Sequence, residues 1–378
     1  MQKKVIALAV AGLVSGAAFA QTSVTLSGTV DLGYNIGKDK WESQTHKYRN
    51  FRGGDGKGMS SSRLNIDVKE QLGSGLKAGY FHEIGLVHFR GTHNDNRMTT
   101  GNDGVTGSNA PAFSRTRQSF AYLESASAGR FQIGLANLII DDQTGFANVG
   151  SRNHVGHAYN ASFDNPRTDA MDLPRANTVS YYSPSFSGFQ VMGQFGYGKS
   201  ELDNSSIKKN EDDSYKIYNL GLKYANGPVT AFIGGQKYEK DASVSTPAGS
   251  TSNEEDLREF VAAAGYDFGV AKLVGMYFDR KNDVNGPNDH KYRGGDIGVK
   301  VPVGQAELFA NYGMGKNKYT ASGAESWKIQ TYQLGARYNL SKRTNVYALY
   351  GYGKAKEKQV GSGTGKGNVV SVGLRHSF

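Results

Sequence analysis

Hydrophobic and polar residues alternate with a period of two in many segments of this chain. Between residues 24 and 36, Val24, Leu26 and Val30 share one parity, whereas Asp31 and Asn35 share the other. Successive side chains of a β-strand point to opposite faces of a sheet, so this pattern indicates strands with one apolar and one polar face. The same alternation recurs in residues 62–70, 189–197, 218–224, 306–314 and 370–378.

The segments between these strands differ systematically in length. Short turns are expected near residues 72–75, 126–129, 185–187, 226–228, 267–269, 302–304 and 340–342. Long polar loops are expected near residues 37–60, 89–113, 138–176, 199–213, 240–256, 281–291, 316–326 and 355–367. The remaining segments give about 16 strands of roughly 9–13 residues each. Tight turns at one end and long loops at the other are typical of an all-β, antiparallel transmembrane barrel.

The composition agrees with a barrel better than with its rival, a secreted soluble β-sandwich or β-helix. The mean hydropathy of −0.53 is low because only one strand residue in two needs to face lipid, while the other faces a wet interior. A barrel of 16 to 18 strands leaves an aqueous channel. The absence of Cys excludes disulfide scaffolds, thiolate zinc sites and cysteine nucleophiles.

The N-terminus has the pattern of a secretory signal peptide. Lys3 and Lys4 precede an apolar stretch over residues 5–14, and residues 18–20 read Ala-Phe-Ala. We therefore expect a signal peptide at residues 1–20 and a barrel over residues 21–378. Loss of the two lysines would lower the formal net charge from +10 to +8.

The last strand predicts a role for the terminal aromatic residue. Phe378 continues the outward parity of Val370, Val372 and Leu374. We expect it to be the barrel-assembly signal, in a last strand that closes onto the first.

Several blocks of the sequence resemble the Gram-negative general porins of the betaproteobacterial type. The most specific are residues 61–81 (SSRLNIDVKEQLGSGLKAGYF) and 175–189 (RANTVSYYSPSFSGF). Weaker blocks extend from the start of the barrel to Phe378, so the resemblance covers almost all of the mature chain. It implies a 16-stranded, trimeric diffusion channel in the outer membrane of a Gram-negative bacterium, with a third loop that folds inward to narrow the pore.

The loop at residues 138–176 is the longest in the chain, and it is too long to be a simple connector. Its carboxylates are the candidate acidic side of a pore constriction: Asp141, Asp142, Asp164, Asp169 and Asp172. In anion-selective members of the family, arginines of the barrel wall line the constriction. By resemblance, these are Arg63, Arg117 and Arg175 here.

Alternation independently predicts which charged residues face the lumen. The basic ones are Arg63, Lys77, Arg117, Arg130, Arg337 and Arg375, and the acidic ones are Asp31, Asp67 and Glu83. Arg130 and Lys77 are therefore added to the candidate basic group. Arginine on one wall facing carboxylates would set a transverse field, and the cationic excess predicts mild anion selectivity for small hydrophilic solutes and ions.

Two observations weigh against a strongly basic constriction. The family commonly has an arginine where this chain has Leu135, within Ile133-Gly134-Leu135-Ala136. Several of the inward cations also have the alternative of pairing with neighbouring acids or of binding lipopolysaccharide phosphates at the rim. Acids on the third loop act in the opposite direction, so reversal of the selectivity is the alternative outcome.

Other chemistry is weakly indicated. The His residues, including His154 and His157, lack metal-ligand spacing, and no Gly-rich segment has a phosphate-binding pattern. We expect no cofactor, although the Asp- and Asn-rich residues 92–96 and 282–289 offer oxygen ligands of the kind that Ca²⁺ takes. An export signal makes nucleic acid an implausible partner. An outer-membrane barrel enzyme and an adhesive or structural barrel are the rival functions. The enzyme has no matching catalytic motif in this sequence, which contains no G-x-S-x-G pattern.

Overall fold

The computed structural model describes residues 22–41, 44–53, 59–86, 113–151, 157–158, 175–204, 209–246, 249–283, 290–319, 325–357 and 364–378. The expected signal peptide lies outside these residues. In chain order the first elements are β1 (Thr22–Trp41), β2 (Gln44–Gly53), β3 (Arg63–Gly73), β4 (Leu76–Leu86), β5 (Phe113–Ser125), β6 (Gly129–Asn137), α2 (Ile139–Gln143), η1 (Thr144–Ala147), β7 (Arg175–Tyr182) and β8 (Phe189–Asn204). They are followed by β9 (Lys209–Asn226), β10 (Val229–Thr246), β11 (Gly249–Asp267), β12 (Lys272–Asp283), β13 (His290–Val303), β14 (Ala306–Tyr319), β15 (Glu325–Asn339), β16 (Thr344–Glu357) and β17 (Thr364–Ser377).

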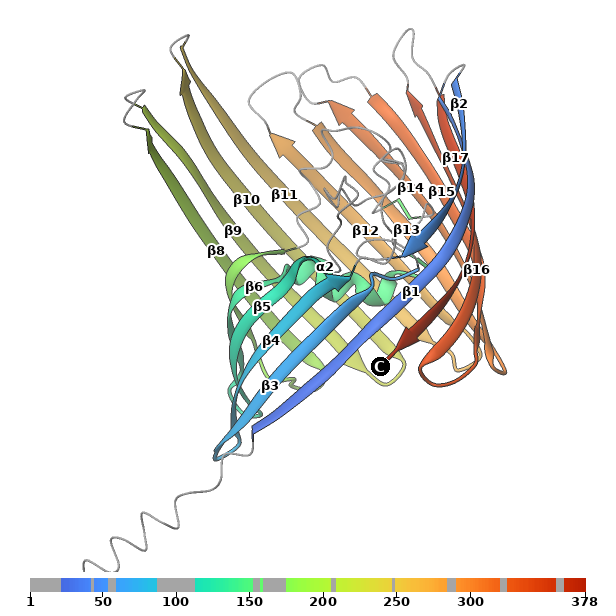
Figure 1. Cartoon of the computed structure of the whole chain (residues 1–378), viewed down its shortest axis with the longest axis horizontal. Helices are drawn as coiled ribbons and strands as arrows, with labels where there is room; N and C mark the ends of the chain where they lie inside the picture. The colour runs from blue at the N-terminus through green and yellow to red at the C-terminus, as the bar shows by residue number, and fades with distance from the viewer. Residues whose placement is uncertain are drawn as a thin grey trace, which may run out of the picture.

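These strands form one antiparallel sheet that closes on itself (Figure 1). Closure joins β1 to β17, with Leu32 opposite Leu374. The backbone of Phe378 exchanges hydrogen bonds of 3.0 and 3.2 Å with that of Gly28. The last strand therefore closes onto the first, as predicted. The role of Phe378 in assembly stays a prediction.

The barrel has 16 strand positions, as predicted, because β2 and β3 share one of them. The upper part of β1 pairs with β2 and the lower part with β3. Leu32 of β1 lies opposite Gly53, and Thr29 lies opposite Arg63. Residues 54–62 thus separate Gly53 from Arg63 in the sequence, whereas only residues 30 and 31 separate their partners on β1. The second strand is therefore interrupted between β2 and β3.

Side chains alternate between lipid and lumen as the sequence pattern requires. Val24 and Leu26 are each 63% exposed on the outside of the barrel, whereas Asp31 and Asn35 are fully buried on the inside. All seven predicted short turns occur between paired strands. Gly73, Gly227 and Gly304 have φ between 53° and 90°, a left-handed conformation that suits glycine in tight turns.

The strands are longer than predicted at the opposite end. β1 and β2 continue into the expected loop 37–60, and β10 and β11 pair almost throughout 240–256. The prediction of long loops was wrong here because the sequence of these strand extensions is rich in polar residues and lacks a regular apolar alternation. Backbone pairing continues there without the apolar alternation that marks the other strands. The five-residue helix α2 is too short to cross a membrane, and the described residues contain no helix that could.

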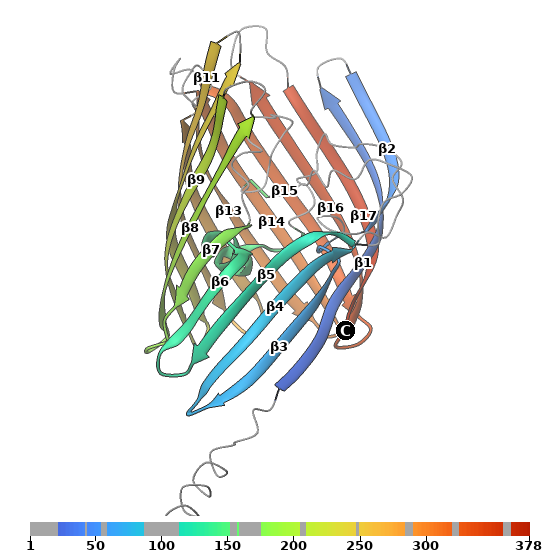
Figure 2. The ribbon, with the colours of Figure 1, turned by 60° about the vertical axis from the view of Figure 1, so that its left-hand side comes forward.

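The barrel wall is uneven in height. Figures 1 and 2 show β3 to β7 as a low wall, with β8 to β11 and β1 rising well above it. Inside the barrel, α2 lies at about the upper edge of the low wall (Figure 2). The region inside the low wall holds most of the candidate site.

Candidate functional site at the inner wall

The structure brings Arg63 and Arg117 together around one carboxylate on the inner face of the low wall. Arg117 Nε donates to Glu83 Oε1 at 2.6 Å, and Arg63 Nε lies 3.3 Å from Glu83 Oε2. The side chains of Arg117 and Glu83 are 10% and 7% exposed, whereas that of Arg63 is 30% exposed. Two guanidinium groups therefore converge on a single carboxylate, and Arg63 is the one open to the lumen.

The register of β3, β4 and β5 produces this convergence. Asn65 of β3 lies opposite Glu83 of β4, and Glu83 lies opposite Gln118 of β5. Arg63 is two residues from Asn65, and Arg117 is next to Gln118, so each arginine is close to a residue that lies opposite Glu83. Alternation correctly predicted the inward parity of Arg63 and Glu83. It was wrong for β5, because Phe120 and Tyr122 lie inside the barrel, and Arg117 faces inward at a β-bulge opposite Glu83 and Ile84.

Arg175 is the first residue of β7 and lies opposite Asn137 of β6. The alternation of β7 puts this position on the side of Val179 and Tyr181, which are exposed on the outer face. Its place at the constriction stays a prediction.

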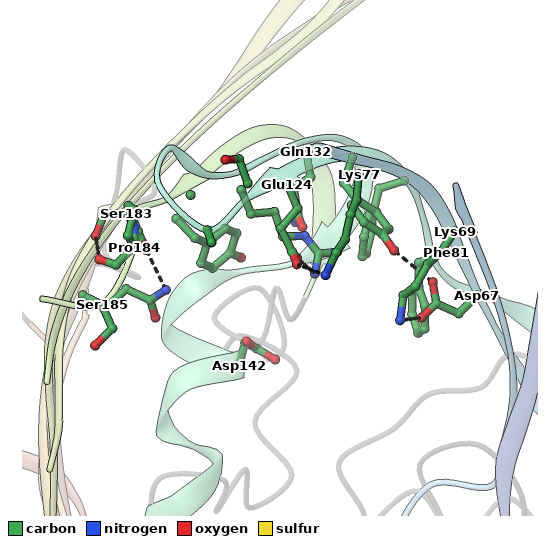
Figure 3. Close-up of a pocket in the computed structure, with 18 of the residues that line it drawn as sticks. Asp67, Lys69, Lys77, Phe81, Glu124, Gln132, Asp142, Ser183, Pro184 and Ser185 are labelled. Atoms are coloured by element: carbon green, nitrogen blue, oxygen red, sulfur yellow. Dashed lines mark hydrogen bonds and ion pairs between the residues drawn. The ribbon is translucent and has the colours of Figure 1, made fainter. Parts of the chain in front are cut away.

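Arg130 and Lys77 form a second group, near the turn end of the low wall. Both approach Glu124, with Arg130 Nη1 at 3.9 Å and Lys77 Nζ at 4.0 Å (Figure 3). The Arg130 guanidinium also stacks 4.1 Å from the ring centre of Tyr122, whose hydroxyl donates to Asp67 at 3.1 Å. These two cations are not brought together with Arg63 and Arg117, because β4 carries Lys77 near one end and Glu83 near the other.

A cavity of about 980 Å³ separates the low wall from α2. Its lining includes Lys77, Glu124 and Arg130 on the wall and Asp142 on the helix. Figure 3 shows Asp142 on the helix side of this space, across from Lys77 and Glu124. Asp141 is the neighbouring helix residue, and it is half-buried. The remaining acids predicted for the constriction lie outside the described residues: Asp164, Asp169 and Asp172.

The environment of Asp142 favours its neutral form. The carboxyl group borders the cavity inside the barrel, where protein atoms replace part of the bulk water around it. This partial desolvation raises the pKa of Asp142, and the negative charge of Asp141 raises it further, against hydrogen bonds from Asn137 and Gln143. The acidic face of the cavity therefore loses charge at a higher pH than an ordinary aspartate would.

The described part of residues 138–158 lies along the opposite inner wall, from β8 to β15. Three buried wall side chains hold its backbone. Gln194 Oε1 accepts from Ile139 N at 3.2 Å, Asp296 Oδ1 accepts from Ala158 N at 2.8 Å, and Gln333 Oε1 accepts from Ser151 N at 2.7 Å. These anchors were not predicted from the sequence, although their inward parity is a signal that points to them.

Apolar contacts fix the same segment. Ile139, Ile140 and Val149 are at most 1% exposed, and they belong to one cluster with inward-facing Phe232 and Phe278. The expectation of a polar inner face was therefore wrong along this wall. Inward phenylalanines are tolerated there because the segment covers them, so they do not meet water.

The described residues contain no group of three or more His, Asp or Glu side chains arranged to hold a metal ion. Of the segments considered for Ca²⁺, residues 92–96 and 284–289 lie outside the described part of the chain, as does His154. His157 is buried within the covering segment.

Comparison with known proteins places these features in a family. Residues 7–358 match the family model described as Gram-negative porin. The chain is 32% identical to outer membrane porin protein 32 of Delftia acidovorans and 28% identical to an outer membrane porin protein of Bordetella pertussis, in each case over the full length of both chains.

A solved structure described as an anion-selective porin from Comamonas acidovorans is also similar. It has a TM-score of 0.67 and 25% sequence identity, with 95% of this chain and 100% of that chain covered.

Proposed function

The chain belongs to the Gram-negative porin family, and from this premise we propose that it is an anion-selective diffusion channel for small hydrophilic solutes. Membership of the family makes it an outer-membrane channel protein rather than an enzyme. The anion preference is supported by the described selectivity of the Comamonas acidovorans porin. The positive formal net charge of +10 also favours anions over cations.

The observation that carries the selectivity is the convergence of Arg63 and Arg117 on Glu83. These three groups together bear a charge of +1, and the guanidinium most open to the lumen is that of Arg63. Arginine keeps its charge at all physiological pH values and binds carboxylate or phosphate in a planar fork. A wall of low dielectric focuses this field into the water beside it and attracts anions.

Residues 138–176 form the second half of the proposed constriction. The described part of this segment occupies lumen space along β8 to β15, and Asp142 borders the cavity opposite the cationic wall. We assign Asp141, Asp142, Asp164, Asp169 and Asp172 to the acidic side. The resulting transverse field orders the charged groups of a passing solute, with its anionic end toward Arg63 and Arg117.

Reversal-potential measurements across a planar bilayer with a KCl gradient test the selectivity. We expect stepwise openings and a permeability to Cl⁻ greater than that to K⁺. A clear cation preference would overturn the proposal. A closed adhesive or structural barrel would give no openings at all.

We further propose that the channel is a homotrimer whose outer surface binds lipopolysaccharide. The outward-facing Lys354, Lys366 and Lys40 lie directly opposite one another on β16, β17 and β1, and Lys38 lies opposite Lys47. Within the described residues none of these five pairs with an acid. Like charges in register destabilise a sheet, so this patch fits an anionic partner such as lipid phosphate.

Thermal unfolding of the purified protein, with and without added lipopolysaccharide, tests the lipid contact. We expect lipopolysaccharide to stabilise the wild type, and to stabilise a Lys354→Gln/Lys366→Gln variant less. Lys342→Gln, in a short turn at the opposite end, is the matched control. Equal stabilisation of all three proteins would refute the lysine patch.

A heat-labile band of three times the monomer mass on gels tests the trimer.

A further inference from the structure

The interruption of the second strand is held against the inner wall by a buried hydrogen-bond network. Ser60 N donates to Asp31 Oδ2 at 2.9 Å, and Ser60 Oγ donates to the same oxygen at 3.2 Å. Ser62 Oγ accepts from Asp31 N at 2.9 Å and lies 3.3 Å from Asp31 O. Asp31 and Ser62 are both fully buried. The single residue Asp31 therefore holds the chain on both sides of Ser61.

Tyr347 supports this network from two strands away. Its hydroxyl donates to Asp31 Oδ1 at 2.7 Å and accepts from Met59 N at 3.3 Å. Tyr347 lies on β16, which is separated from β1 by β17. Its ring is 4% exposed and packs in the same inner cluster as Met59. The hydroxyl thus ties residues 59–62 to a part of the wall with which they share no strand pairing.

The held segment ends directly at Arg63. Arg63 Nη1 donates to the carbonyl oxygen of Ser61 at 3.3 Å, while its Nε faces Glu83. One end of the guanidinium is therefore oriented by Glu83 and the other by Ser61. The position of the Ser61 carbonyl depends in turn on the bonds that Ser60 and Ser62 make to Asp31.

We propose that Asp31 and Tyr347 are positioning residues that set the ion selectivity of the channel by orienting Arg63, without touching the permeating ion. This inference rests on the proposed function, since it requires Arg63 to act on anions. An exposed arginine has many rotamers, so fixing the guanidinium at both ends keeps its charge at one place beside the pore. Loss of one anchor lets the charge spread over a larger volume and weakens the local field.

The test uses Tyr347→Phe, because this substitution changes no charge and keeps the buried ring. In planar bilayers with a KCl gradient, we expect the anion-over-cation permeability ratio to fall about twofold. Tyr350→Phe is the matched control, since Tyr350 lies on the outer face of the same strand; its ratio should equal that of the wild type. Ser62→Ala is a second variant, expected to act in the same direction if Tyr347→Phe folds poorly.

A double-mutant cycle with Arg63→Gln separates positioning from a general structural effect. If Tyr347 acts through Arg63, adding Tyr347→Phe to Arg63→Gln should change the ratio no further. An equal fall with and without Arg63 would overturn the positioning role, as would an unchanged ratio in both Tyr347→Phe and Ser62→Ala. Should Arg63→Gln itself leave the ratio unchanged, both this inference and the arginine constriction of the proposed function would fall. A shift in Arg63→Gln alone would overturn only the inference.

Discussion

Two buried glutamates on opposite inner walls each form an equivalent ion pair with a buried arginine: one on the low wall, the other on the wall that the described part of residues 138–158 covers. Glu83 accepts from Arg117 Nε at 2.6 Å on the low wall, and Glu259 accepts from Arg280 Nε at 2.6 Å on the covered wall. All four side chains are at most 10% exposed. The second partner differs. Glu83 also faces the guanidinium of Arg63, whereas Glu259 accepts at 2.6 Å from the neutral amide of Gln236.

This difference indicates where the field of the channel comes from. A carboxylate and one arginine cancel in charge, so neither pair by itself gives the inner wall a net charge. The third group decides whether a net charge remains: Arg63 carries a positive charge, whereas Gln236 is neutral. Inward arginines are therefore not equivalent in a barrel, and counting them overestimates the anionic preference.

The largest effect is expected on the free energy of unfolding, when either buried carboxylate is removed. Glu83→Gln and Glu259→Gln each leave a buried arginine without its principal partner, and we expect each to lower the free energy of unfolding by about 3 kcal/mol. Urea titration of the detergent-folded protein measures this loss. Glu307→Gln is the control, because its partner Arg337 and the carboxylate itself are more exposed and should contribute less. Equal losses in all three variants would contradict the dependence on burial, and unequal losses in Glu83→Gln and Glu259→Gln would contradict the equivalence of the two buried pairs.

The next largest effect is expected on ion selectivity, when the third group at each site, Arg63 or Gln236, is exchanged. Arg63→Gln makes the low-wall site resemble the covered one, and we expect the anion-over-cation permeability ratio to fall about fivefold, as for about 1 kcal/mol of interaction with a nearby charge. Gln236→Arg makes the reverse change and should raise the ratio. Reversal potentials measure both. Ratios that move in the same direction would show that the third partner does not set the field.

The pH dependence should be smaller. The raised pKa of Asp142 means that its carboxyl group is neutral at low pH and gains charge as the pH rises through that pKa. The anion preference should therefore increase by about twofold when the pH falls below the pKa of Asp142. Reversal potentials measured between pH 4 and pH 8 in wild type and Asp142→Asn test this. The variant should keep the low-pH ratio throughout. A wild-type preference that decreases on acidification would have the wrong sign.

The smallest effect is expected at the turn end of the low wall. The Lys77 side chain is 42% exposed and 4.0 Å from Glu124, so solvent screens its charge. Lys77→Gln should change the permeability ratio by less than about 1.5-fold. A shift as large as that of Arg63→Gln would mean that the ion experiences both cationic groups equally.

Local sequence patterns predicted much of the fold. The parity of Val24, Leu26 and Asp31 correctly assigned lipid and lumen faces, and glycine-containing turns marked one end of the barrel. The upper parts of β1, β2, β10 and β11 were missed because their sequence is rich in polar residues and lacks a regular apolar alternation. A ladder of backbone hydrogen bonds needs no apolar alternation, so periodicity cannot detect it.

The candidate site was predicted less completely. Parity placed Arg63 and Arg130 inside, but it gives only the face of a strand and not the height along it. Arg117 reaches the same face only through a β-bulge in β5, which no alternation pattern shows. Register separates Arg130 from the other two. The anchors Gln194 and Gln333 bind residues far away in the sequence, so no local pattern points to them.

The sequence by itself determined that this chain forms a barrel and which side of each strand faces water, because the two-residue period of a strand is a local property. Only the tertiary structure decided that Glu83 is shared by two arginines, and that Asp31 and Tyr347 hold the segment before Arg63. Those contacts join residues that are up to 316 positions apart. They exist only after the sheet has closed and the register of each strand against its neighbour is set.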